Sequence, residues 1–160
     1  MNRVRLIAVL LLGVATSAAT PPPKPSADSV RSDVQGFVKT YVDVQNKFDA
    51  SATMELVSRK PGVASIVMGE ITRGWDAIRD DVDSTIGSEG RLKLALGTID
   101  VNPLGSGFAL AFAPCTITVI TDSGELQLKG ALTLVLEKSS GKWKVLHEHA
   151  SVQLPDAEGD

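Results

Sequence analysis

The stretch "ELQLKGALTLVLEKSSGKWKVLHEHASVQL" (residues 125–154) decides the fold of this chain. Apolar and polar residues alternate for a dozen positions up to Lys138, and a second alternating run follows from Lys142. Side chains of a strand alternate between two faces, so each run predicts a strand with one apolar face. "KSSG" (138–141) is typical of a tight turn. The sequence therefore predicts a long antiparallel hairpin at the end of the chain.

Two further strands precede this hairpin. "RLKLALGTIDV" (91–101) alternates through Leu96 and changes parity at Gly97, which predicts a bulge or bend. "GFALAFAPCTITVI" (107–120) is interrupted by Pro114, which suits an edge or a bulge. Turn sequences separate the strands, so we expect four long antiparallel strands in a sheet that can curl strongly.

The first half of the chain predicts helices instead. Apolar residues spaced by three and four form one stripe between Val30 and Phe48, and Ser26 or Asp28 can cap this helix. A short helix follows over 49–62 with Asp49 as its N-cap, then two short strands joined around Gly69, then a helix over 75–87. This order predicts an α+β domain with the helices on one face of an antiparallel sheet.

The ends of the chain suggest export. A cleaved signal peptide is predicted over 1–19 from two arginines, the apolar run at 6–15 and the small residues up to Ala19. An uncleaved membrane anchor is the alternative, although the apolar run is short for a membrane span. We expect a proline-rich tether at 20–28, one domain at 29–154 and an acidic flexible tail at 155–160. The expected location is the periplasm or the surrounding medium, without stable membrane insertion.

Composition limits the partners. The 160 residues carry 16 Lys and Arg against 19 Asp and Glu, a net charge of −3, and no basic stripe, so nucleic acid is not an expected partner. The single cysteine, Cys115, cannot form an internal disulfide, and we interpret it as a buried thiol. No nucleotide or hydrolase motif occurs, and we expect no cofactor.

Three segments carry a resemblance to a known family. "FVKTYVDVQNKFDASATMELV", "MGEITRGWDAIR" and above all "GKWKVLHEHAS" resemble the SnoaL-like branch of the nuclear-transport-factor-2-like (NTF2-like) superfamily, over about residues 30–151. The resemblance implies a single cone-shaped α+β domain, in which a strongly curved antiparallel sheet is covered on its concave face by three N-terminal helices. It also implies a homodimer formed through the sheet.

The two histidines, His147 and His149, raise the question of function. Strict alternation puts them on one face with Trp143 and Val145, which would turn them into the cone and leave Glu148 outside. Leu146 and Ala150 would then also lie outside, so parity alone does not settle the face.

Candidate site residues follow from that orientation. His147 is the candidate proton-transfer residue with Asp49 as its orienting partner, and the histidines could equally be structural residues. Candidate ligand-binding residues are His149, Trp75, Glu70, Tyr41 and Arg73, although Trp75 could simply anchor its helix and Arg73 could be a surface residue. The His-x-His pair would need a third ligand to hold a metal, and no metal site is expected.

We therefore expect an exported protein that binds a small organic molecule in a partly polar pocket. If it is an enzyme, cofactor-independent isomerisation, dehydration or cyclisation fits best. Ketosteroid isomerisation is a poor match, because its constellation of a tyrosine and two carboxyl groups cannot be assigned residue by residue. The alternative is a dimeric scaffold without catalysis.

Overall fold

The computed structural model describes residues 25–87, 91–121 and 124–153. The expected signal peptide (1–19), most of the tether and the acidic tail (155–160) lie outside these residues. Three helices precede most of the sheet in chain order, which confirms the α+β class. Within the described residues, no helix is sufficiently long and apolar to cross a membrane.

The helices lie close to their predicted positions. α1 (Ala27–Asn46) begins after the N-cap Ser26, whose side chain accepts a hydrogen bond from the backbone of Ser29, so the helix starts two residues before the expected domain boundary. α2 (Ala50–Glu55) has the predicted N-cap Asp49 and ends well before the predicted end at residue 62. α3 (Trp75–Gly87) matches the prediction.

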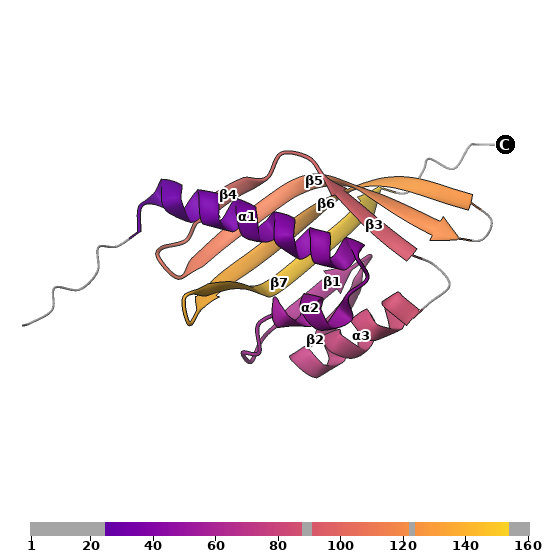
Figure 1. The fold of residues 1–160 in the computed structure, drawn as a ribbon, viewed down its shortest axis with the longest axis horizontal. Coiled ribbons are helices and arrows are strands. Elements are labelled where there is room, and N and C mark those ends of the chain that lie inside the picture. The colour runs from indigo at the N-terminus through magenta and orange to yellow at the C-terminus, as the bar shows by residue number, and fades with distance from the viewer. Residues whose placement is uncertain (1–24, 88–90, 122–123, 154–160) are drawn as a thin grey trace, which may run out of the picture.

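The strands form a single curved sheet. In spatial order it runs β2 (Glu70–Arg73), β1 (Ala64–Val67), β7 (Lys142–Gln153), β6 (Gly124–Ser139), β5 (Phe108–Thr121) and β3 (Arg91–Leu96), with β4 (Asp100–Pro103) also paired to β5. All neighbours are antiparallel except β1 and β7. Figure 1 shows α1 lying across this sheet, with α2 and α3 at the end near β1 and β2.

The predicted break at Gly97 divides one expected strand into two. β3 and β4 pair with successive parts of β5, and Pro114 lies between the two paired segments. The backbone N–H of Gly97 donates to the Pro114 carbonyl, and a Cβ on Gly97 would lie 2.8 Å from the proline ring. Glycine thus lets the chain turn over a proline that cannot itself donate to a neighbouring strand.

A bulge in β7 changes which side chains face inward. Leu136 of β6 pairs with Val145, whereas Val135 pairs with His147, so Leu146 is an extra residue without a partner in this register. A bulge of this kind reverses the alternation beyond it. Trp143 and Val145 are buried on the inner side, and after the bulge it is Glu148 and Ala150 that continue this face.

The core lies between the helices and the concave face of the sheet. The inner positions of β5 and β6 are small alanines and large leucines, and the buried stripe of α1 packs near them: Ala109, Ala111, Ala113, Leu132, Leu134, Leu136, Val30, Val34 and Val38. Small residues opposite large ones allow α1 to approach a curved sheet closely. Cys115 is buried in this core, as predicted.

Candidate functional site

A cavity of about 440 Å³ lies between the three helices and the concave face of the sheet. Its walls come from all three helices and from five strands, β1, β2, β3, β5 and β7. Most of the surface of the wall is apolar, and its apolar residues are mainly aliphatic, as the low aromatic content predicts. A cavity of this size, mainly apolar with a few convergent polar groups, is the usual form of a small-molecule site.

The main polar feature of the cavity is a pair formed by Tyr41 and Glu148. Tyr41 is only 2% exposed, and its hydroxyl donates a hydrogen bond of 2.8 Å to Oε2 of Glu148. Tyr41 comes from the buried stripe of α1, and Glu148 reaches it from β7 because the bulge turns its side chain inward. Gln45, one helical turn after Tyr41, also bonds to this pair.

Burial changes the acidity of both groups. It raises the pKa of the Glu148 carboxyl above its usual value, and hydrogen bonds from Tyr41 and Gln45 offset part of that rise. Burial also holds the pKa of Tyr41 well above its usual value, and the nearby Glu148 charge adds to the effect. Tyr41 therefore remains a phenol that donates to Glu148, while Glu148 is a carboxyl group suited to exchanging a proton closer to neutral pH.

Other polar groups also line the cavity. Thr53 of α2 is 1% exposed, and among the described residues nothing hydrogen-bonds its Oγ1. The hydroxyl of Thr72 donates to the carboxylate of Asp81, and Glu70 lies nearby at the start of β2. The unpaired Thr53 hydroxyl is thus available to a ligand, because an isolated buried hydroxyl gains by finding a partner.

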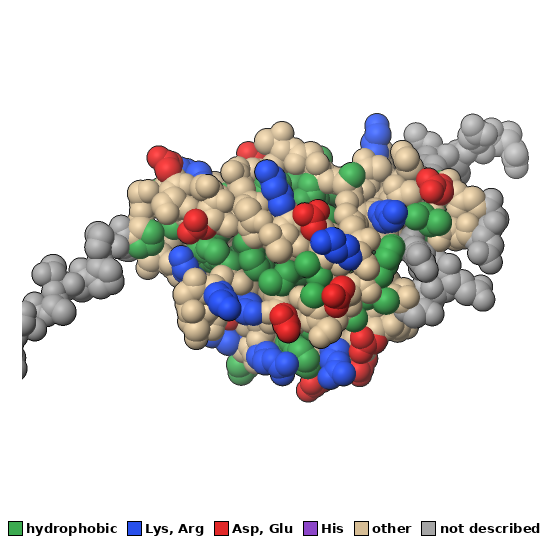
Figure 2. All heavy atoms as spheres, in the orientation of Figure 1, with side chains coloured by type: hydrophobic (Ala, Val, Ile, Leu, Met, Phe, Trp, Pro, Cys, Tyr) green, Lys and Arg blue, Asp and Glu red, His purple; other side chains and the backbone are tan. Residues whose placement is uncertain are grey.

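The structure corrects the expected orientation of the histidines. His147 and His149 lie on the face opposite Trp143 and Val145, because the bulge at Leu146 reverses the alternation. His147 pairs across the sheet with Ala64 and Val135 and is half-buried, and His149 is exposed. No histidine is visible on the helix side of the molecule in Figure 2.

Asp49 and His147 are not brought together. The Asp49 carboxylate accepts a 2.9 Å hydrogen bond from the backbone of Ala52 and caps α2. It shares no hydrogen bond or ion pair with His147 among the described residues. Asp49 is therefore placed as a helix cap, and the proposed orienting contact is missing.

The remaining candidates divide between three places. Tyr41 and Glu70 line the cavity. Trp75 instead lines a second groove on the other side of α2 and α3, and Arg73 is exposed at the end of β2, opposite Ala64. Glu148, the central carboxyl group of the cavity, was expected on the outer face, and only the mismatch in register between β6 and β7 places it inside.

No cluster of three or more His, Cys, Asp or Glu side chains suited to a metal ion occurs among residues 25–87, 91–121 and 124–153. The polar side chains of the cavity carry a phenol, three carboxyl groups, one amide and several hydroxyls. Such groups can bind and protonate an organic molecule directly.

The sequence pattern of the SnoaL-like domain matches residues 34–155. The chain belongs to the SnoaL-like family. This SnoaL-like protein has the cone fold that the resemblance implies, with a curled sheet and helices packed on it. No curated protein matches it in sequence.

Solved structures share its fold at low identity. An NTF2-like superfamily protein of Salmonella enterica is 20% identical, covers 84% of this chain and 100% of its own, and has a TM-score of 0.72. A protein of Streptomyces avermitilis, proposed to be a dehydratase of the NTF2-like family, is 16% identical over 81% and 100% of the two chains, with a TM-score of 0.73. A proposed scytalone dehydratase of Novosphingobium aromaticivorans is 12% identical over 77% and 83%, with a TM-score of 0.68.

Proposed function

We propose that the cavity of this SnoaL-like protein binds a small, mainly apolar organic molecule and that Glu148 exchanges a proton with it. The observation that carries this proposal is the Glu148 carboxyl, which faces the cavity, accepts a hydrogen bond from Tyr41 and has a pKa raised by burial. An acid or base is most effective when its pKa lies near the working pH. Glu148 thus replaces His147 as the candidate proton-transfer group.

Tyr41 acts as a positioning residue in this proposal. Its hydroxyl holds Oε2 of Glu148, so the orientation of the carboxyl group is fixed before a ligand enters. Abstraction of a proton next to a ligand carbonyl would give an enol or enolate, and return of the proton to another carbon would complete an isomerisation. Alternatively, the enolate would expel a β-hydroxyl group, and delivery of the proton to that leaving oxygen would complete a dehydration with release of water. Two of the structural neighbours are proposed dehydratases, which supports the same class of chemistry.

The test uses 2-tetralone, a neutral ketone with acidic α-hydrogens, in D₂O. We expect the protein to accelerate exchange of these hydrogens for deuterium, observed by proton NMR, and Glu148→Gln to abolish the acceleration. The matched control is the double variant His147→Gln, His149→Gln, which changes only side chains on the opposite face of β7. It should exchange the ketone at the rate of the wild type.

The proposal would be rejected if the histidine variant lost the accelerated exchange while Glu148→Gln retained it. Saturable binding of 2-tetralone without exchange in the wild type would restrict the function to binding. In that case Glu148→Gln and Thr53→Val should still weaken binding, because both remove polar groups of the cavity wall.

A second candidate function, dimeric assembly, is supported by the convex face of the sheet. Ile71, Ile66, His149, Thr133 and Phe112 form one row across five strands in register. Ile71, on the edge strand β2, is 48% exposed and Phe112, on β5, is 40% exposed, so the row ends in large apolar side chains that face solvent. We propose that this face pairs with a second copy of the chain.

Sedimentation equilibrium tests the dimer. Phe112→Asp should shift the protein to a monomer, whereas Leu104→Asp should leave the dimer intact, because Leu104 is also exposed, at 55% against 40% for Phe112, but lies outside the row. A monomeric wild type would reject assembly through the sheet.

Export is a separate proposal, which rests on residues 1–19. Its test is the N-terminal sequence of the protein purified from its native host, which should begin at Thr20.

A further inference from the structure

A second, larger groove of about 810 Å³ lies on the other side of α2 and α3. Of the described residues, only Val57 lines both this groove and the cavity, so the two spaces are separate. Each helix presents one face to each space: α3, for example, turns Ile78 and Val82 to the cavity and Arg79 and Asp83 to the groove. Nothing in the cavity chemistry accounts for the groove.

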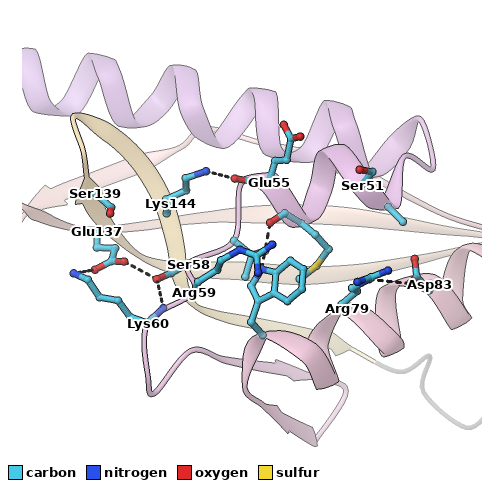
Figure 3. A pocket seen from close by; sticks show the side chains of 14 residues that line it. Ser51, Glu55, Ser58, Arg59, Lys60, Arg79, Asp83, Glu137, Ser139 and Lys144 are labelled. Atoms are coloured by element: carbon cyan, nitrogen blue, oxygen red, sulfur yellow. Dashed lines mark hydrogen bonds and ion pairs between the residues drawn. The ribbon is translucent and has the colours of Figure 1, made fainter.

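The centre of the groove is Trp75 with two arginines. The guanidinium carbon of Arg59 lies 3.6 Å from the centroid of the indole, and that of Arg79 lies 5.9 Å from it (Figure 3). Arg79 has a carboxylate partner, Asp83, at 3.5 Å. Arg59 is exposed and has no carboxylate partner among the described residues. The indole holds the Arg59 guanidinium in place, while the N–H groups of the guanidinium remain available to hydrogen-bond a ligand.

Three carboxylates line the groove, those of Glu55, Asp83 and Glu137, and none of them forms an ion pair with Arg59 in the part of the chain that the structure describes. Glu137 is only 1% exposed, accepts hydrogen bonds from Ser58 at 2.5 Å and from Lys60, and is thereby occupied. Burial alone would raise the pKa of Glu137, but the bonds from Lys60 and Ser58 outweigh it and lower the pKa, so this carboxylate stays ionised and paired. Lys144 donates to the neutral backbone carbonyl of Glu55, which leaves its charge uncompensated.

The groove is therefore cationic on a protein whose net charge is −3. Of the described side chains that line it, four are cationic, namely Arg59, Lys60, Arg79 and Lys144, against three carboxylates. Figure 2 shows several Lys and Arg side chains over the lower part of this face, near α2 and α3, with Asp and Glu side chains between and beside them. A cleft with an excess of one charge focuses the field and concentrates ions of the opposite charge.

We propose that this groove binds a small planar organic carboxylate, with the carboxylate group held by Arg59. A guanidinium presents two parallel N–H groups that match the two oxygens of a carboxylate, and charge-assisted bonds of this kind are among the strongest in proteins. Met54 and Val57 supply apolar wall against which a planar body can lie, and the hydroxyls of Ser51 and Ser139 line the same space. The site is independent of the proposed chemistry at Glu148.

The test is a titration of the ¹⁵N-labelled protein with benzoate at constant ionic strength. The chain has two tryptophans, Trp75 and Trp143, so the spectrum contains two indole N–H signals, which Trp75→Phe assigns. We expect the Trp75 signal to move saturably and the Trp143 signal to stay in place. Arg59→Gln should weaken binding about tenfold or more, because it removes a charge-assisted bond.

Three matched variants sharpen the result. Lys129→Gln removes one positive charge from an exposed position outside the groove and should leave the affinity unchanged. Arg59→Lys keeps the charge without the paired N–H groups and should give an intermediate affinity. Glu148→Gln should bind benzoate as the wild type does, so the outcome here is separate from the outcome at the cavity.

The proposal fails if the Trp75 signal shows no saturable shift. It also fails if Arg59→Gln binds as tightly as the wild type, or if Lys129→Gln loses as much affinity as Arg59→Gln. The absence of a saturable shift would mean that Arg59 only packs on the indole. An equal loss of affinity in Lys129→Gln and Arg59→Gln would mean that benzoate binding depends on net charge alone.

Discussion

Replacing Glu148 with glutamine should make the protein more stable at neutral pH while removing its proposed acid–base group. The folded state raises the pKa of Glu148, so folding holds the proton on this carboxyl more tightly than the unfolded chain does. Its contribution to stability is therefore complete at pH values below the ordinary range of a glutamate, and it is lost as the pH rises through the folded pKa. Above that pH, the wild type must bury an ionised carboxylate, whereas the glutamine side chain of the variant is neutral.

The size of the effect follows from the position of the side chain. A pKa that folding raises by one unit corresponds to about 1.4 kcal/mol of stability. Glu148 lines a cavity and keeps partial contact with solvent, so we expect a gain of about 1 kcal/mol at pH 8 rather than the full penalty of a sealed charge. In a domain of this size, that gain raises the melting temperature by about 4 °C. The amide oxygen of the introduced glutamine can still accept the hydrogen bond from Tyr41.

Urea unfolding of the wild type and Glu148→Gln at pH 8 and pH 4 measures this difference. The variant should be more stable at pH 8, and its advantage should shrink at pH 4, where the wild-type carboxyl binds its proton. Glu125→Gln, at an exposed position on β6, is the matched control and should leave the stability unchanged at both pH values. A variant that is less stable than the wild type at pH 8, or an advantage of equal size at both pH values, would refute the reasoning.

Two further predictions concern the site and the sheet. Tyr41→Phe removes a hydrogen bond that lowers the pKa of Glu148, so the pKa of Glu148 should rise further, as measured by ¹³C NMR titration. The variant should also lose about 1–2 kcal/mol of its free energy of unfolding in urea. An unchanged pKa of Glu148 would contradict the pairing of the two side chains. Gly130→Ala should lower the free energy of unfolding by about 1–3 kcal/mol, because the new Cβ would lie 2.3 Å from the carbonyl oxygen of Ser151. Gly36→Ala should instead stabilise the protein by about 0.5–1 kcal/mol, because the space around the new Cβ in α1 is open and alanine favours a helix. If thermal unfolding showed equal effects of the two glycine variants, the close approach of the Ser151 carbonyl to Gly130 would not determine which residue this position accepts.

Local patterns were sufficient to predict most of the fold. The apolar stripe of α1, the cap at Asp49 and the turn around Gly69 each follow from rules that act within a few residues. The parity change at Gly97 was also visible, because the alternation on both sides of it is long. The extra division into β3 and β4 was not, since it depends on where each segment meets β5.

The candidate site could be predicted only in part, because its central residue depends on pairing between strands. "KVLHEHAS" gives no local sign of a bulge: it contains no glycine or proline, and every residue fits an extended strand. The extra residue, Leu146, is defined only by the register of β6 against β7. Tyr41 was found because a polar tip on a buried helical stripe is visible in the sequence, whereas its partner Glu148 was placed on the wrong face.

The bulge also explains why one face of β7 carries core residues before Leu146 and a carboxyl group of the cavity after it. Before Leu146, the inner face of β7 carries Trp143 and Val145 and belongs to the core, and after it the same face carries Glu148 at the cavity. Without the extra residue, the imidazoles would point into the cavity and Glu148 would lie on the convex face. A single inserted residue thus assigns a carboxyl with a raised pKa to the interior and leaves the two histidines on the face proposed for dimerisation. Because the insertion fixes both assignments together, the exchange assay tests both of them, since it compares Glu148→Gln with the variant that changes both histidines.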